Sequence, residues 1–133
     1  MKKIVLLFMS VMALSLAISC DKDNSNDSDI IGTWLKVSES FDDESGDDDT
    51  KYLQFRKDGT LIMIDDYDEI VSDCYITWSM EGKVLTITLM SVDFGTQTGS
   101  GNVDITKDTL IIIGNGFRIT YKRVPDSTIN KYL

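Results

Sequence analysis

From Ile30 onward, apolar and polar residues alternate with a period of two, and this pattern constrains the fold more than any other feature of the chain. In Lys51 to Lys57, for example, Leu53 and Phe55 alternate with polar or amphipathic neighbours. Such an alternation places apolar side chains on one face of a β-strand, whereas an amphipathic helix needs a period of 3.6. Only Asp126 to Leu133 is suited to a C-terminal helical turn or a segment across a barrel end. The sequence therefore predicts an all-β domain.

Turn signals divide the alternating part of the sequence into short strands. Glycine is the second residue of two expected turns, Asp58-Gly59 and Asn115-Gly116. It readily adopts the positive φ that tight hairpin turns require. The stretch 95–101, rich in glycine and threonine, is expected to be a loop. The expected strands are 30–40, 51–57, 60–64, 74–80, 84–90, 102–106, 109–113 and 117–124.

Sequential antiparallel strands leave no unpaired edge when they close into a barrel. We therefore predict a small eight-stranded antiparallel up-and-down β-barrel over residues 30–133, with a two-sheet sandwich as the alternative. About a hundred residues are enough for one domain with one modest core.

The N-terminal segment has the pattern of a secretory signal peptide. Lys2 and Lys3 precede an apolar run from Ile4 to Leu16, and small residues then lead to Cys20. This apolar run is too short for a membrane-spanning helix of about 20 residues. We expect residues 1–19 to be a cleaved signal.

The segment Ala17-Ile18-Ser19-Cys20 resembles the lipobox of bacterial lipoproteins. The resemblance implies that Cys20 is lipidated and becomes the first residue of the mature chain. The alternative is a plain cleavable signal that happens to precede a cysteine. Residues 21–29 contain no apolar side chain, which indicates that 20–29 form a lipidated cysteine with a solvated acidic linker.

The start of this linker also carries a sorting pattern. Asp21, Lys22 and Asp23 resemble the acidic export signals that some Gram-negative bacteria place after the lipidated cysteine. The resemblance implies an outer-membrane lipoprotein exposed at the cell surface. In enteric-type sorting, Asp directly after the cysteine instead implies retention in the inner membrane.

The charge of the mature chain limits the classes of partner that we expect it to bind. All 22 acidic residues follow Cys20, and loss of Lys2 and Lys3 leaves 11 basic side chains against them, a net charge of −11. Such a surface repels phosphate-rich partners, so we expect no nucleic acid binding. It also repels anionic lipid, so we expect the acyl anchor to be the membrane contact. Burial of each CH₂ group of an acyl chain in the membrane contributes about 0.8 kcal/mol, so two or three acyl chains anchor the protein stably.

The sequence lacks the usual catalytic groups. It contains no histidine, which removes the commonest general base and the usual zinc and haem ligands. With Cys20 lipidated, Cys74 is the only other thiol, and Asp73 beside it should raise its pKa. Asp104 is the one acid set within a strand alternation, and we expect it to face water. We predict no enzyme activity, no cofactor and a monomer.

The opening of the domain resembles a known family. Ile31-Gly32-Thr33-Trp34 is similar to the Gly-x-Trp start of lipocalins, and Tyr75-Ile76-Thr77-Trp78 adds to a likeness to small lipocalin-like domains of bacterial surface lipoproteins. In that family the tryptophan closes one barrel end and an arginine from the last strand stacks on it. The resemblance implies that Arg123 is the partner of Trp34, with Arg118 as the alternative.

Three aromatic residues are candidates for a pocket. Phe55, Trp78 and Tyr121 would line an apolar pocket if they point inward together, or else fill a small core. The resulting hypothesis is a membrane-tethered, non-catalytic lipocalin-like lipoprotein that binds a small apolar ligand at the cell surface.

The alternative hypothesis is a surface interaction module that contacts a protein or glycan through loops 42–50 and 65–72 and the aromatic residues Tyr67 and Phe94. The run Asp42 to Asp49 is rich in carboxylates, but the EF-hand spacing for Ca²⁺ is absent. We therefore assign no metal site, although two acidic loops at one barrel mouth would make a shared cation site plausible.

Overall fold

The computed structural model describes residues 29–42, 49–93 and 95–133 of the chain. The predicted signal peptide and Cys20 lie outside the described residues, as do most of the acidic linker and Phe94. The described elements are β1 (Gly32–Phe41), β2 (Thr50–Phe55), β3 (Leu61–Asp65), β4 (Tyr75–Glu81), β5 (Val84–Ser91), β6 (Gly95–Ile105), β7 (Thr109–Gly114), β8 (Phe117–Val124) and the 3₁₀-helix η1 (Asp126–Tyr132).

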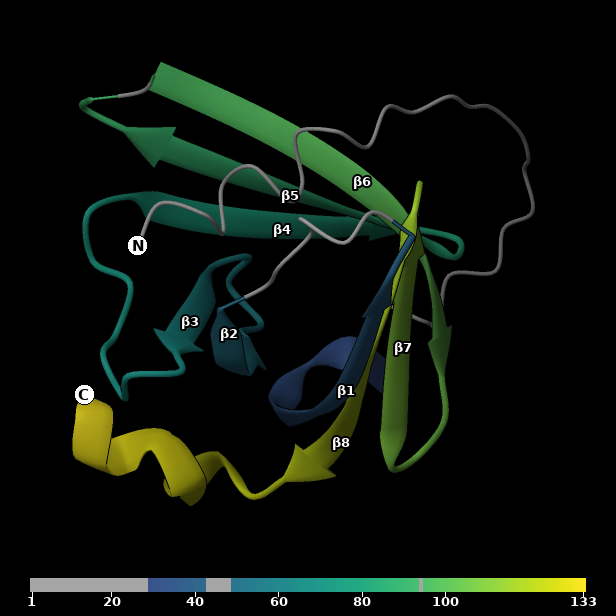
Figure 1. Cartoon of the computed structure of the whole chain (residues 1–133). Coiled ribbons are helices and arrows are strands. Elements are labelled where there is room, and N and C mark those ends of the chain that lie inside the picture. Colours follow the sequence, from purple (N-terminus) through teal and green to yellow (C-terminus); the bar gives the residue numbers. More distant parts are fainter. Residues whose placement is uncertain (1–28, 43–48, 94) are drawn as a thin grey trace.

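The strands form one antiparallel sheet that curls into a nearly closed barrel (Figure 1). Their order is β3-β2-β1-β8-β7-β6-β5-β4, so consecutive strands pair except at β3 and β4, and β1 pairs with β8. The β1–β8 ladder runs from Thr33 opposite Val124 to Phe41 opposite Phe117, with a bulge between Lys36 and Ser38. The predicted up-and-down barrel is confirmed over the two-sheet sandwich.

The junction between β3 and β4, which we call the seam, is the weakest part of the barrel wall. The backbone contacts across the seam include a bridge between Thr60 and Thr77 and a 2.9 Å hydrogen bond from the Trp78 N–H to the Gly59 carbonyl oxygen. The edge of β3 pairs mainly with the loop that follows it, since the Val71 N–H donates to the Met63 carbonyl oxygen at 2.9 Å.

The expectation of a loop at 95–101 is wrong, because these residues form the first part of β6. They pair with β5 in a continuous ladder from Gly95 opposite Ser91 to Asn102 opposite Val84. Thr96, Thr98 and Ser100 lie on the outer face, and threonine suits an exposed strand. The glycine content suggested a loop, but β5 provides a full-length pairing partner that fixes the extended conformation.

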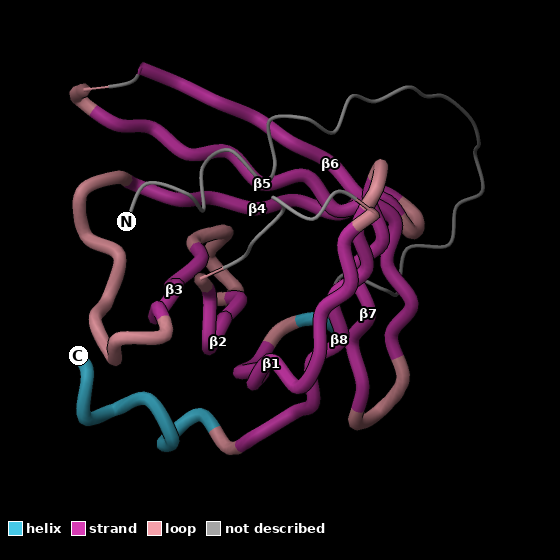
Figure 2. Tube along the Cα trace, in the orientation of Figure 1, coloured by secondary structure: helices cyan, strands magenta, loops and turns pink. Residues whose placement is uncertain are grey.

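The pairing divides the barrel into two parts. The five-stranded half is β3-β2-β1-β8-β7, and the three-stranded half is β6-β5-β4. The halves join at the seam and along a short ladder in which Asn102 to Ile105 of β6 pair with β7. The 3₁₀-helix η1 contacts β1 of the five-stranded half, and Figure 2 shows it as the cyan segment that ends at the C-terminus. Ile129 of this helix is buried, and its Tyr132 lies against Tyr52 with ring centroids 6.1 Å apart.

One hydrophobic core lines the inside of the barrel. Alternate residues of all eight strands contribute to it, as the period of two predicts. Within the described ranges, no helix is long and apolar enough to cross a membrane. The buried members of the core are Ile30, Trp34, Leu53, Phe55, Leu61, Met63, Ile76, Leu85, Ile87, Leu89, Val103, Leu110, Ile112, Phe117, Ile119 and Tyr121.

Candidate functional site

The barrel end that contains Trp34 is closed by a cation–π contact. Trp34 is 0% exposed, and the Arg123 guanidinium carbon lies 4.2 Å from the centroid of its ring. The Trp34 Nε1–H donates a 2.9 Å hydrogen bond to the Ile30 carbonyl oxygen, so the polar edge of the buried indole is also satisfied. Arg118, the alternative partner, is exposed at the other end of β8.

Arg123 also ties two backbone segments, residues 29–31 and the turn at Lys107, to this end of the barrel. Its guanidinium donates to the carbonyl oxygens of Asp29 at 2.7 Å, Ile31 at 3.0 Å and Lys107 at 2.8 Å. A Cβ at Gly32, which has φ +138°, would lie 2.6 Å from Arg123 Nη1. Glycine in the Gly-x-Trp motif therefore allows the arginine to approach the backbone.

Two of the three candidate pocket residues meet behind the seam. The rings of Phe55 and Trp78 pack edge to face, with centroids 5.5 Å apart and planes at 88°. Phe55 is buried, whereas Trp78 is half-buried and donates its Nε1–H to the Arg56 carbonyl oxygen at 3.0 Å. Tyr121 is buried on β8, opposite Leu110, and belongs to the same core. The structure thus places an aromatic pair from the two halves beside the seam.

The inner wall of the three-stranded half includes a residue that the sequence analysis missed. The register places Ile76, Leu89 and Gln97 in one inward-facing row. The adjacent row contains Trp78, Ile87 and Gly99. Gln97 was overlooked because 95–101 was expected to be a loop. The signal for it was the alternation of Gln97, Gly99 and Gly101 with the outward hydroxyl residues.

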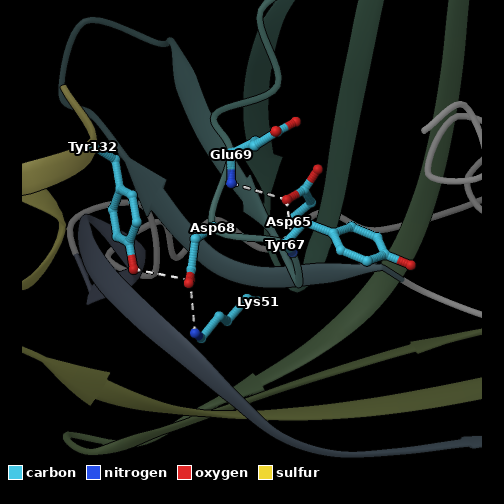
Figure 3. A network of polar contacts seen from close by, with 6 residues as sticks. All are labelled: Lys51, Asp65, Tyr67, Asp68, Glu69 and Tyr132. Atoms are coloured by element: carbon cyan, nitrogen blue, oxygen red, sulfur yellow. Dashed lines mark hydrogen bonds and ion pairs between the residues drawn. The ribbon is translucent and has the colours of Figure 1, made fainter.

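The acidic loop between β3 and β4 is held by its own first residue (Figure 3). The Asp65 side chain is 4% exposed, and its Oδ1 accepts hydrogen bonds from the N–H groups of Tyr67 at 2.9 Å and Glu69 at 3.0 Å. The Asp65 N–H in turn donates to the Glu69 carbonyl oxygen at 2.9 Å. These bonds fix a turn in which Tyr67 is 77% exposed.

Asp68 ties this loop to two other elements. Its Oδ1 accepts from Lys51 Nζ at 2.8 Å and from the Tyr132 hydroxyl at 3.1 Å (Figure 3). Asp68 has φ +64°, a left-handed conformation that aspartate adopts more readily than most residues. The hydrogen bond with Lys51 lowers the pKa of Asp68, and the same bond raises the pKa of Lys51.

The two acidic loops meet at the barrel end opposite Trp34. The Asp66 N–H donates to the Asp49 carbonyl oxygen at 2.8 Å, and burial raises the pKa of the Asp66 carboxyl. Residues 43–48 of the first loop lie outside the described part. Among the described residues, no three acidic or cysteine side chains are grouped so as to hold a metal ion.

The remaining reactive candidates lie apart from the aromatic pair. Cys74 is a free, half-buried thiol against the core, and burial, with a further contribution from Asp73, raises its pKa. Asp104 is exposed on β6 and lines a surface recess of about 50 Å³ with Lys83, Val103 and Ile105.

The comparisons with known proteins concern the fold. No family model and no curated protein matches the sequence. Two solved structures are similar to this chain. A lipocalin-like protein from Bacteroides uniformis has a TM-score of 0.54 at 15% identity and covers 72% of this chain and 99% of its own. An uncharacterized protein from Bacteroides eggerthii has a TM-score of 0.53 at 13% identity and covers 71% and 99%. The chain therefore has a lipocalin-like fold.

Proposed function

We propose that this chain is a membrane-tethered, non-catalytic lipocalin-like lipoprotein that binds a small apolar ligand inside its barrel at the cell surface. The seam in front of the Phe55–Trp78 pair is the observation that carries this proposal. An eight-stranded barrel has an interior that side chains fill or that holds one small ligand.

The seam provides a route to the interior. Local opening begins where few backbone hydrogen bonds and few packed side chains hold two segments together. The other strand contacts are ladders of several residue pairs, whereas the bridge between Thr60 and Thr77 and the bonds of Trp78 to Gly59 and Arg56 hold the seam. Separation of β3 from β4 there would expose Phe55 and Trp78 to an entering apolar molecule.

A disulfide across the seam tests this route. Thr60→Cys and Thr77→Cys, combined with Cys74→Ser, would place two thiols on a bridged pair, and such cross-strand neighbours have the Cα separation that a disulfide needs. The full chain, purified with its anchor into lipid nanodiscs, is mixed with the apolar dye N-phenyl-1-naphthylamine, and the fluorescence of empty nanodiscs is subtracted. Oxidation should slow dye uptake at least about tenfold, and reduction should restore it.

The matched control is a disulfide in the continuous β5–β6 ladder. Thr86 and Ser100 are cross-strand neighbours with hydroxyl oxygens 3.1 Å apart, so Thr86→Cys with Ser100→Cys closes no open junction. Dye uptake should be the same in its oxidised and reduced forms. Equal uptake by the oxidised and reduced seam variant would contradict entry through the seam, and no uptake by the wild-type protein would contradict the proposed function.

The proposed location is the outer membrane with the barrel outside the cell, attached as a monomer through acyl chains on Cys20. The lipobox-like segment and the acidic residues that follow Cys20 support this location. Metabolic labelling with palmitate should mark the wild-type protein, and Cys20→Ser should abolish the label. Protease added to intact cells should remove the barrel. A protected barrel would contradict surface display.

The Tyr67 loop favours a second candidate, a surface module that contacts a protein or glycan. Asp65 and Asp68 hold this loop in one conformation while the Tyr67 side chain stays exposed. A rigid exposed aromatic residue loses little entropy when it binds a partner. Pull-down of partners from the protein's natural surroundings should fail after Tyr67→Ala and persist after Lys57→Ala, which changes an exposed residue at the other barrel end. Equal capture by both variants would contradict this role.

A further inference from the structure

Gln97 carries a buried polar atom that the fold leaves without a hydrogen-bond partner. Its Oε1 is buried and accepts no hydrogen bond from any residue the structure describes. A buried acceptor without a partner costs about 1–3 kcal/mol of desolvation, and native proteins satisfy most such groups. The position of this atom therefore calls for a functional explanation.

Gln97 lies on a mostly apolar part of the inner barrel wall. The register puts Gln97 on the same face as Leu89 and Ile76, both of which are buried in the core. The next row along the wall contains Trp78 and Ile87 beside Gly99, which has no side chain to cover them. Small-molecule sites combine a mostly apolar lining with a few polar groups that fix orientation.

We infer that the Gln97 Oε1 is the polar contact for the bound molecule, which therefore has an apolar body and one hydrogen-bond donor at its end. This inference rests on the proposed function, because it needs a ligand inside the barrel. The apolar body lies along Trp78 and Ile87, and the donor, a hydroxyl or an N–H group, points toward β6. A glutamine amide is uncharged and would leave a buried charge uncompensated among apolar side chains, which favours a ligand with a neutral donor.

Two probes with the same number of carbon atoms test the need for a hydrogen-bond donor separately from the need for an apolar body. 1-Octanol has a hydroxyl donor, and its isomer heptyl methyl ether has none. Each is titrated against the full chain in nanodiscs loaded with N-phenyl-1-naphthylamine, and dye displacement gives its Kd. The wild-type protein should bind the alcohol roughly 3- to 10-fold more tightly than the ether, the range expected for one hydrogen bond to a buried acceptor.

The variant that tests the role of the amide is Gln97→Leu, with Gln97→Met as a second variant of closely similar shape should the first fail to fold. The alcohol preference should fall to about 1 in either variant while dye binding is retained. Thr98→Val is the matched control, because it makes a similar change to the next residue, which faces outward. It should keep the wild-type preference.

The outcomes distinguish the inference from the function on which it rests. An alcohol preference that survives in Gln97→Leu, or a wild-type protein that binds both probes equally, would overturn the role of Gln97 and leave the apolar-ligand function intact. A wild-type protein that binds neither probe nor the dye would overturn both. Loss of the alcohol preference in Gln97→Leu, with the preference kept in Thr98→Val, supports both the role of Gln97 and the apolar-ligand function.

Discussion

The two halves of the barrel differ in how they are held. In the five-stranded half, Arg123 stacks on Trp34 and binds three backbone carbonyl oxygens, and η1 packs across the outer surface. In the three-stranded half, the outer face carries threonine and serine, with Tyr75 58% exposed and Met90 37% exposed. Its inner face carries Gln97 with an unsatisfied oxygen.

This difference assigns separate tasks to the two halves. Multiple contacts from Arg123 and a fully buried Trp34 stabilise the five-stranded half. The three-stranded half is joined to it by a four-pair ladder with β7 and by the seam, and separation at the seam breaks few backbone bonds. Binding sites are often drawn from the less stable parts of a fold, and the seam has the fewest backbone bonds of the described strand contacts.

The largest expected effect is the loss of the closed end. Trp34→Ala removes a fully buried indole and should lower the free energy of unfolding by about 3–5 kcal/mol, the range for large-to-small core substitutions. Tyr75→Ala, at an exposed site on the three-stranded half, should change it by less than about 0.5 kcal/mol. Urea unfolding measures both, and equal effects would remove the distinction between the halves.

Arg123→Ala is expected to have the next largest effect. The variant loses the cation–π contact and the hydrogen bonds to Asp29, Ile31 and Lys107, at a cost of about 1–3 kcal/mol in unfolding free energy. Arg118→Ala removes an equal charge from an exposed position on the same strand and should cost little. A loss of similar size in Arg118→Ala would show that the effect reflects net charge rather than the Trp34 stack.

The aromatic pair behind the seam should couple the halves only weakly. A double-mutant cycle of Phe55→Leu and Trp78→Leu should give an interaction free energy of about 0.5–1.5 kcal/mol, the range for edge-to-face ring pairs. Thermal or urea unfolding of the four proteins supplies the cycle. An interaction free energy near zero would mean that the rings do not hold the seam closed.

The smallest effect concerns the loop held by Asp68. The lowered pKa of Asp68 means that its bond to Lys51 stabilises the fold above the ordinary aspartate value of 3.8 and is lost as pH falls through the lowered pKa. The Tm difference between the wild-type protein and Asp68→Asn should therefore be constant near neutral pH and vanish in strong acid.

For Asp66, in the same loop, the expected dependence of stability on pH has the opposite sign to that for Asp68. Burial raises its pKa, so its ionised form disfavours the folded state, and stability associated with this group rises as pH falls through the raised pKa. Asp66→Asn should raise the Tm near neutral pH, and the gain should shrink at acid pH, where the wild-type carboxyl is protonated. The same pH dependence in Asp66→Asn and Asp68→Asn would contradict these assignments.

Local patterns in the sequence were enough to predict the barrel. The period of two and the glycines at hairpin turns depend on neighbouring residues, and the strands lie close to their expected positions. The first part of β6 was missed because its extended form depends on pairing with β5 rather than on its own glycine-rich composition. Gln97 was missed for the same reason.

The site was predictable where a local motif or the strand alternation marked it. The Gly-x-Trp segment pointed to Trp34, and the resemblance pointed to Arg123, which the structure places 4.2 Å from the Trp34 ring. The contact of Asp68 with Lys51 and Tyr132 joins residues 17 and 64 positions apart in sequence. No local pattern encodes such a contact, and an unsatisfied buried oxygen is visible only once all neighbours are placed.

A ligand carried inside the barrel can be detected by native mass spectrometry of the intact protein, extracted from its own cells and released from detergent micelles. The account predicts a non-covalent mass beyond the acylated chain that organic solvent removes, identified as an apolar molecule with a hydrogen-bond donor. The mass of the acylated chain alone, together with failure to take up N-phenyl-1-naphthylamine, would contradict a ligand-binding barrel.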